Sequence, residues 1–501
     1  MGVIRRQGMY SALFTYSGFV VGAFNLFFLY TFILTPEQFG LTRALMAVGA
    51  VLMQFAMMAT FSMMYKFFPY YKDYLKKDES DFAFMSLVVP FFGFVMITLG
   101  MLLFKDFFVL KFSEHSPLLV KYYYYIIPFT FSFLYFTIFK THLNIRLNAA
   151  FPTFLEDLGY KFYSIIIVLL YYINVISFDV FMMLFCTYYF VGLIPMFLKL
   201  RREGDFHIVP KLSKVSRRLG KKILSYGGFI YAGLIIGELA EYLAPIMISG
   251  MEGLKNTGIL SIAIYLVAIL QVPQKAMFGV TISVMSDAWK RKDIRTIETL
   301  YKKTALNMLL AGLLIFVAIW VSIDEILALL PPAYMEAKPV VLLLSLAKLF
   351  DLACGMNGEL LNTSNFWKFN FGTQVLLLII LIPVNYLFIS NYGILGTGYA
   401  ALVSQFIYNG VRFWFIYYKF KLQPFTLDIV KGVFVAGLLY TLVYFVPGFT
   451  GTKIENIISI CLRSGLFATL FLIAIIYFRI SEDIAQFSTQ IMRRIKGMMG
   501  R

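Results

Sequence analysis

The chain has 501 residues, of which 60% are hydrophobic and 14% are charged. A soluble domain is roughly 45–50% apolar and about 25% charged, so this composition excludes a water-soluble globular protein and indicates a bilayer as the solvent. Apolar residues run continuously for about twenty positions instead of alternating, which excludes an outer-membrane barrel and predicts spanning helices. The net charge of +17 is typical of basic cytoplasmic loops, so we expect no nucleic-acid partner.

The hydropathy pattern predicts about fourteen transmembrane helices, so the expected fold class is an all-α integral membrane protein. In chain order the predicted spans are 9–34, 41–65, 82–104, 118–139, 154–173, 180–198, 223–248, 257–285, 304–323, 340–361, 371–389, 395–418, 429–445 and 457–478. Lys and Arg concentrate in the loops that follow even-numbered spans. Both termini are therefore predicted to be cytoplasmic.

A basic stretch divides the predicted spans into two groups. We expect an N-lobe at 1–200 with helices 1–6, a basic cytoplasmic linker at 201–222, a C-lobe at 223–420 with helices 7–12, helices 13–14 at 421–479, and a basic amphipathic cytoplasmic tail at 480–501. Gly40 and Gln54 of the second span recur as Gly258 and Gln271 of the eighth. This weak similarity suggests a parallel repeat of two six-helix lobes, as in a transporter with a cleft between lobes.

Polar and charged residues inside the spans are the candidate site residues, because each charge costs about 2.5–3.5 kcal/mol on insertion scales and usually lines a cavity or pairs with a partner. The candidate substrate-binding residues are Arg43, Lys275, Lys348, Asn25, Gln54, Gln271 and Gln274. The candidate ion-coupling residues are Glu238, Glu241, Asp351 and Glu359.

The spacing of these charges leaves alternatives open. Glu238 and Glu241 lie three residues apart on one helical face without an obvious partner. Lys348 and Asp351 have the same spacing, so they either line a cavity or neutralise each other as a structural pair. Arg43, Arg412 and Arg463 lie close enough to span ends to snorkel to the interface, and ligand contact is the alternative that we keep mainly for Arg43. Glu359 returns to nearly the same face as Lys348 in a continuous helix.

Nothing in the sequence indicates an enzyme. The three histidines have no metal-ligand spacing, and no P-loop motif is present. We expect no catalytic residue, no metal and no cofactor, with a coupling Na⁺ or H⁺ as the one small-ion requirement.

Four junction motifs carry a resemblance to a known family. They are NYGILGTGYAALVSQ from Asn391, TPEQFGLTRAL from Thr35, NTGILSIA from Asn256, and VPQKA from Val272 followed by DAWKRKD from Asp287. With the fourteen-helix layout, they resemble the polysaccharide-transporter (oligosaccharide flippase) branch of the multidrug/oligosaccharidyl-lipid/polysaccharide exporter superfamily. Many relatives carry two basic residues after the proline of the fourth motif, whereas one of them is Gln274 here.

The resemblance implies a flippase of the bacterial inner membrane. It would move an undecaprenyl-pyrophosphate-linked oligosaccharide from the cytoplasmic to the outer leaflet by alternating access, for cell-surface polysaccharide biosynthesis. Lys275 and Arg43 are the best candidates to bind the pyrophosphate. Membrane lipids, the lipid-linked oligosaccharide and a saccharide polymerase or assembly machinery are the expected partners.

Other functions stay open at this point. A cation-coupled multidrug exporter of the same superfamily would share the layout but rely on acidic and aromatic cavity residues. A saccharide polymerase would need an essential residue in an external loop, and a non-transporting scaffold would tolerate the loss of both Lys275 and Arg43.

Overall fold

The computed structural model describes residues 2–204, 206–449 and 451–486, and this part of the chain contains helices and no strand. Up to residue 258 the helices are α1 Gly2–Phe24, η1 Asn25–Tyr30, α2 Thr31–Ile33, α3 Pro36–Met57, α4 Thr60–Tyr74, α5 Phe82–Leu103, α6 Lys105–Phe112, α7 Pro117–Lys121, η2 Tyr123–Tyr125, α8 Ile126–Ile145, α9 Ala150–Phe154, η3 Leu155–Gly159, α10 Tyr160–Tyr172, α11 Phe178–Arg202 and α12 Lys214–Met251. They are followed by α13 Gly253–Ala268, η4 Ile269–Gln271, α14 Val272–Arg291, α15 Ile294–Trp320, α16 Ile323–Ala328, η5 Pro332–Glu336, α17 Ala337–Ala353, α18 Asn357–Thr363, α19 Trp367–Tyr392, α20 Leu395–Phe420, α21 Leu427–Tyr444 and α22 Lys453–Tyr477. The all-α fold class is confirmed.

Each predicted span coincides with a helical segment. Within the described residues, 11 helices are long and apolar enough to cross a membrane, or up to 12 if the bent pair Pro332–Ala353 and Asn357–Thr363 is one span. The remaining two predicted spans correspond to the helical run of α9, η3 and α10, which carries three charged residues, and to α20, which carries Asn409 and Arg412. Polar residues in these two helices leave them less apolar than the others.

The chain divides into two compact units, the first ending at Gly258 and the second beginning at Ile259. Helix α12 packs against α3 and α4 within the first unit. The predicted linker 201–222 is irregular only between the end of α11 at Arg202 and the start of α12 at Lys214. The predicted tail 480–501 is described only as far as residue 486. The proposed six-plus-six division into lobes stays a prediction.

Basic loops that follow even-numbered spans meet at one end of each unit. In the first unit, Lys77 after α4 donates a hydrogen bond to the carbonyl oxygen of Gly204 after α11, at 3.3 Å. In the second, Lys303 of α15 lies 2.7 Å from Asp483, beyond α22. This hydrogen bond lowers the pKa of the Asp483 carboxyl. Both contacts join segments that follow even-numbered spans, as alternation of helix direction requires, whereas the cytoplasmic location of these ends stays a prediction.

Helices α3 and α13 approach each other through the two glycines that the sequence repeat equates. A Cβ built on Gly40 would lie 1.8 Å from the carbonyl oxygen of Leu254, and one built on Gly258 would lie 2.8 Å from that of Pro36. Only a residue without a side chain fits such a backbone contact. The N-terminus of α3 is positioned by a capping box between Thr35 and Gln38.

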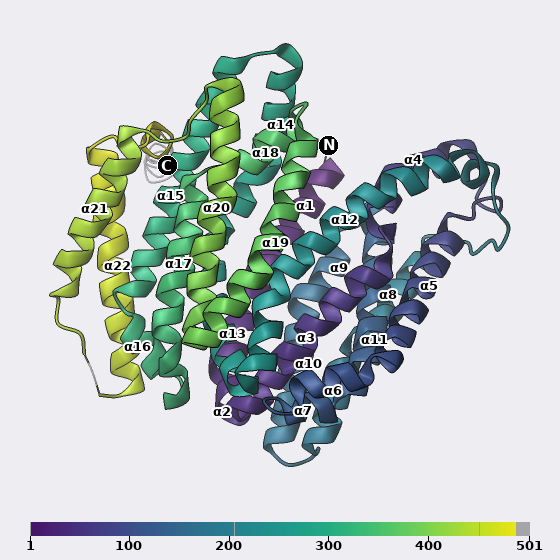
Figure 1. Ribbon diagram of the computed structural model, residues 1–501, viewed down its shortest axis with the longest axis horizontal. Helices are drawn as coiled ribbons and strands as arrows, with labels where there is room; N and C mark the ends of the chain where they lie inside the picture. Colours follow the sequence, from purple (N-terminus) through teal and green to yellow (C-terminus); the bar gives the residue numbers. More distant parts are fainter. Residues whose placement is uncertain (1, 205, 450, 487–501) are drawn as a thin grey trace, which may run out of the picture. The chain divides into compact units, whose positions relative to one another are not determined.

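The last two helices of the second unit, α21 and α22, run side by side (Figure 1) and pack on α15. Phe467 and Phe471 of α22 are fully buried in this core. An ion pair closes its end: Arg463 of α22 lies 2.6 Å from Glu325 of α16, with side chains 12% and 8% exposed. Arg463 also donates to the carbonyl oxygens of Val446 and Tyr444. It is therefore an internal clamp, and the expectation that it snorkels is wrong.

The glycine contact gives a first prediction. Gly40→Ala should lower the thermal unfolding midpoint of the detergent-purified protein, because the new methyl group collides with backbone that cannot rotate away. Gly100→Ala is the matched control, since a Cβ at Gly100 of α5 meets no atom within 4 Å. Where the new methyl group meets no neighbour, a Gly→Ala substitution inside a helix stabilises the folded state by about 0.5–1 kcal/mol. Equal midpoints for the two variants would contradict the close contact.

The buried clamp gives a second prediction. Glu325→Gln should destabilise the protein by about 3 kcal/mol or more, because it leaves the Arg463 charge buried without its counter-ion. The neighbouring Asp324→Asn removes the more exposed pair with Lys338 and should cost at most about 1 kcal/mol. Denaturant titration of the two variants in one detergent makes the comparison. Similar losses would show that burial does not set the strength of the clamp.

Candidate functional site

Arg43 lies two turns into α3, surrounded by aromatic rings. Its guanidinium carbon is 5.1 Å from the ring centroid of Phe39 and 5.5 Å from that of Tyr30, and both rings are buried. Its buried Nε has no hydrogen-bond partner, and no ion pair of Arg43 is present among the described residues. The rings stabilise the cation by about 0.5–2 kcal/mol and leave part of its hydrogen-bonding capacity unused.

The shell around Arg43 extends to two further helices of the first unit. The charge of Arg43 lies within electrostatic range of Tyr160 and Lys161 of α10 and of Tyr242 of α12. The Tyr160 ring stacks with Tyr189 of α11 at a centroid distance of 6.0 Å. Sequence reasoning missed this aromatic shell, because the tyrosines come from three helices far apart in the chain.

The two amides predicted in this unit occupy different surroundings. Asn25, 5% exposed, begins the π-helical turn η1 and donates to the hydroxyl of Ser164 at 2.6 Å. Tyr30 shares the same hydroxyl at 2.9 Å. Asn25 therefore joins two helices beside the Arg43 shell. Gln54 lies further along α3, and its buried Nε2 has no hydrogen-bond partner among the described residues.

The acidic pair of α12 faces the same shell. Glu238 is partly buried and Glu241 is exposed, and Tyr242 lies within electrostatic range of both carboxylates as well as of Arg43. Neither glutamate forms an ion pair with any residue that the structure describes. The predicted coupling carboxylates Glu238 and Glu241 therefore lie in the same unit as Arg43 and share Tyr242 as a neighbour.

The predicted charges of the second unit lie at a helix break. Lys348 and Asp351 of α17 form an ion pair at 2.8 Å, with side chains 17% and 20% exposed. The helix ends after Ala353, and α18 resumes at Asn357 with a bend of 43°. Gly355 has a φ of +62°, which suits a residue without a side chain. The expectation that Glu359 follows Lys348 on one continuous helical face is therefore wrong.

The side chain of Arg412 in α20, and not a shared helical face, links the carboxylates of Asp351 and Glu359. It is 7% exposed, and both Asp351 and Glu359 lie within electrostatic range. Its guanidinium carbon lies 3.9 Å from the Tyr408 ring centroid, and its Nε donates to Thr373 at 3.1 Å. Its predicted snorkelling is thus wrong, because the bend between α17 and α18 brings carboxylates to its side chain.

Two hydrogen-bonded asparagine side chains complete the cluster around Arg412. Asn357 donates to the side-chain oxygen of Asn409 at 2.8 Å, and Asn409 donates to Asp351 at 3.2 Å. Both asparagines are buried. The sequence signal that could have found them is the spacing of Asn409 and Arg412, three apart on one face of α20. Asp351 is therefore held by a lysine and an amide at once, which favours the structural alternative for the Lys348 pair.

The remaining candidates lie at the start of α14. The helix changes to 3₁₀ geometry over Ile269–Gln271, directly before Pro273, whose ring removes a backbone donor. Gln271 and Gln274 are partly buried, and Lys275 is exposed. Arg43 and Lys275 belong to different compact units, so their predicted cooperation stays a prediction. Among the described residues, no cluster of His, Cys, Asp and Glu has the arrangement of a metal site.

Comparisons with known proteins identify the fold. No protein-family model matches the chain, and no curated protein matches it significantly. A structure of the lipid II flippase MurJ in an inward closed conformation matches 94% of this chain and 99% of its own, with a TM-score of 0.70 and 16% identity. An inward-facing multidrug resistance MATE transporter of the MOP superfamily matches 79% of this chain and 94% of its own, with a TM-score of 0.60 and 14% identity. A MATE structure in a bent conformation matches 87% and 96%, with a TM-score of 0.52 and 14% identity.

The three structures are described as a flippase and as MATE proteins. At 14–16% identity they establish a shared fold. The chain therefore shares the fold of the MurJ and MATE structures, in agreement with the fold that its sequence resemblance implies.

Proposed function

We propose that the chain is a flippase that moves an undecaprenyl-pyrophosphate-linked oligosaccharide from the cytoplasmic to the outer leaflet by alternating access, in the bacterial inner membrane, for cell-surface polysaccharide biosynthesis. Both termini would be cytoplasmic, and a saccharide polymerase or assembly machinery would receive the product. The observation that carries the proposal is Arg43, a guanidinium inside a spanning unit, without a described ion pair and with an unused donor.

A pyrophosphate group fits the surroundings of Arg43. A guanidinium binds phosphate oxygens through two parallel hydrogen bonds, and these bonds strengthen where water is excluded. Lys161 lies within electrostatic range of Arg43, so two like charges repel in this unit. Glu156 and Asp157 lie within range of Lys161 and offset part of its charge. A doubly charged ligand would relieve the repulsion and satisfy the free Nε of Arg43.

The extent of the fold match also favours a flippase. The MurJ structure matches 94% of this chain, and the higher-scoring MATE structure matches 79%. MurJ is described as a flippase of lipid II, which is a lipid-linked substrate. A lipid-linked saccharide is therefore the substrate class that we infer for this chain.

A cation-coupled multidrug exporter is the second candidate. Glu238 and Glu241 favour it, because carboxylates without a described ion pair suit a cationic drug or a coupling cation. In the flippase they would serve as the site for a coupling Na⁺ or H⁺. The two functions differ in what Arg43 does, since a cationic substrate gains nothing from a guanidinium.

Transfer of a fluorescent undecaprenyl-pyrophosphate oligosaccharide across proteoliposomes tests the flippase. Arg43→Gln should slow transfer at least tenfold, and Arg43→Lys should retain part of it, because an ammonium keeps the charge but loses the two-pronged geometry. Lys111→Gln, an exposed change on α6, is the charge-matched control. Unchanged transfer by a well-folded Arg43→Gln would refute the role of Arg43. Gradient-driven efflux of a cationic dye without lipid transfer would establish the exporter instead.

The same vesicles test the acidic pair. The double variant Glu238→Gln and Glu241→Gln should abolish the acceleration of transfer by an imposed pH or sodium gradient, because a neutral amide does not take up the coupling cation. Glu252→Gln at the end of α12 should keep the acceleration, since this carboxylate already accepts a hydrogen bond from Asn256. If the double variant responds to the gradient like the native chain, coupling does not depend on these two residues.

A further inference from the structure

The spanning segment that begins with α3 is broken at Met58 and Ala59, where α3 ends and α4 begins. These two residues have φ angles of +46° and +61°, both in the left-handed region. A residue with a side chain is strained there, and two such residues in succession interrupt the helix. Among the described residues, consecutive left-handed residues occur only at this break. The backbone is therefore strained inside a spanning segment.

Nothing in the local sequence accounts for this break. Residues 51–64 contain no Gly and no Pro, the residues that usually interrupt a helix, and their Met and Ala residues are strong helix formers. The hydropathy pattern accordingly predicts a single helix over 41–65. No described side chain caps the start of α4. Contacts with other helices must therefore hold the break in place.

Helix α12 packs directly on the break. The hydroxyl group of Tyr231 donates a hydrogen bond to the carbonyl oxygen of Phe55 at 2.6 Å. In a continuous helix this oxygen would accept from the amide of Ala59. One turn before Tyr231, a Cβ built on Gly227 would lie 2.2 Å from the methyl group of Met63 and 3.8 Å from the Cβ of Ala59. Tyr231 therefore takes the place of a helical donor where α12 lies against α4.

Helix α5 contacts the break as well. A Cβ built on Gly93 would lie 2.2 Å from the carbonyl oxygen of Ala56, so only a residue without a side chain admits this carbonyl group. In a continuous helix the same oxygen would accept from the amide of Thr60. The broken form is thus stabilised by contacts with α5 and α12, whereas the local backbone preference favours a continuous helix.

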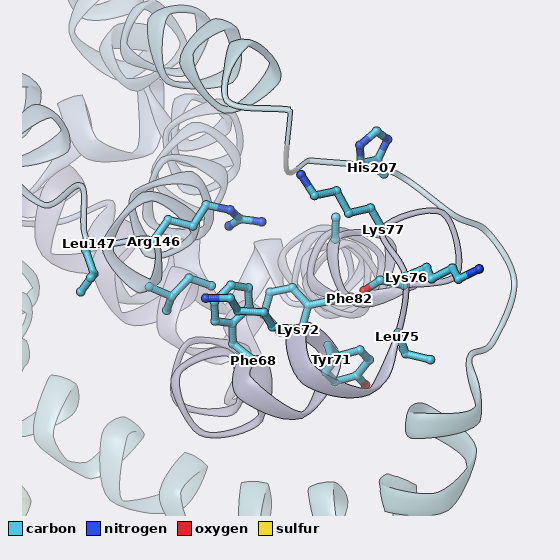
Figure 2. A pocket seen from close by; sticks show the side chains of 13 residues that line it. Phe68, Tyr71, Lys72, Leu75, Lys76, Lys77, Phe82, Arg146, Leu147 and His207 are labelled. Carbon is cyan, nitrogen blue, oxygen red and sulfur yellow. The ribbon is translucent and has the colours of Figure 1, made fainter.

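An apolar groove of about 310 Å³ lies beside the break. Met58 and Met63 line it, together with Val89 of α5. Further along α4, the Tyr71 ring lines the same groove and packs on Phe82 of α5, with centroids 5.2 Å apart (Figure 2). Successive side chains of an α-helix turn by about 100° per residue, so a change of geometry at the break reorients the side chains that line the groove.

We propose that Met58 and Ala59 form a conformational switch within the first unit, with Tyr231 as its positioning residue. In the broken form, the hydrogen bond from Tyr231 holds the Phe55 carbonyl group out of the helical ladder. When this bond is released, the two residues return to right-handed geometry, α3 and α4 join as one helix, and the lining of the groove changes. The inference concerns this change alone and does not depend on which substrate the chain carries.

Hydrogen–deuterium exchange of the full chain in detergent, measured by mass spectrometry at the amides of residues 60–62, tests the switch. These first amides of α4 lack an acceptor within α4, so they should exchange more slowly once α3 and α4 join. Tyr231→Phe should slow their exchange at least threefold, because it releases the Phe55 carbonyl group to the helix. Adding Ala59→Gly should restore the faster exchange, since glycine adopts a positive φ without strain.

Tyr135→Phe is the matched control and should leave this exchange unchanged, since it removes a hydrogen bond of the same kind, to the carbonyl oxygen of Leu87 at 3.0 Å. Unchanged or faster exchange in Tyr231→Phe would overturn the proposal, because the loss of a merely bracing bond loosens a helix and does not tighten it. Ala59→Gly alone provides a second measurement. It should raise the thermal unfolding midpoint by relieving the strain, whereas Ala47→Gly in regular α3 should lower it, and a lowered midpoint in both would contradict the switch. Exchange is measured without substrate or gradient, so failure of the switch is distinguishable from failure of the flippase.

Discussion

The cost of placing charge and unpaired backbone groups in hydrocarbon governs this structure. A helix satisfies its backbone internally, so the apolar chain folds as helices throughout the described residues. Side-chain charges cannot be satisfied that way, and each needs other side chains or backbone carbonyl groups around it. The structure therefore depends on how a small number of intramembrane charges are accommodated among many apolar side chains.

Two kinds of solution are present. Arg463 and Glu325 neutralise each other, and carbonyl oxygens take up further donors of the arginine, so the end of α22 is locked. The Lys348 and Asp351 pair is likewise closed by Asn409. Arg43 differs, because aromatic rings stabilise its charge while its Nε has no partner. A closed pair holds a fold together, whereas an open donor is free to bind a ligand and release it.

The proposed phosphate site inside the first unit depends on Arg43. Its guanidinium is surrounded by rings, so a phosphate there would be held by a few strong bonds with little water. This arrangement suits a substrate that must pass through.

The sequence by itself determined the membrane environment, the number and order of helical segments and the positions of the intramembrane charges, because hydropathy and charge are local properties read along the chain. The Arg43 and Glu238 candidates followed from that reading alone. Only the tertiary structure decided which charges meet. The bend at Gly355 brings Glu359 and Asp351 near Arg412, and helix packing buries Arg463, although both arginines lie near predicted span ends. The contact of Gly40 and Gly258 and the surroundings of Arg43 likewise join residues distant in sequence, and such contacts depend on helix rotation and crossing, which hydropathy does not encode.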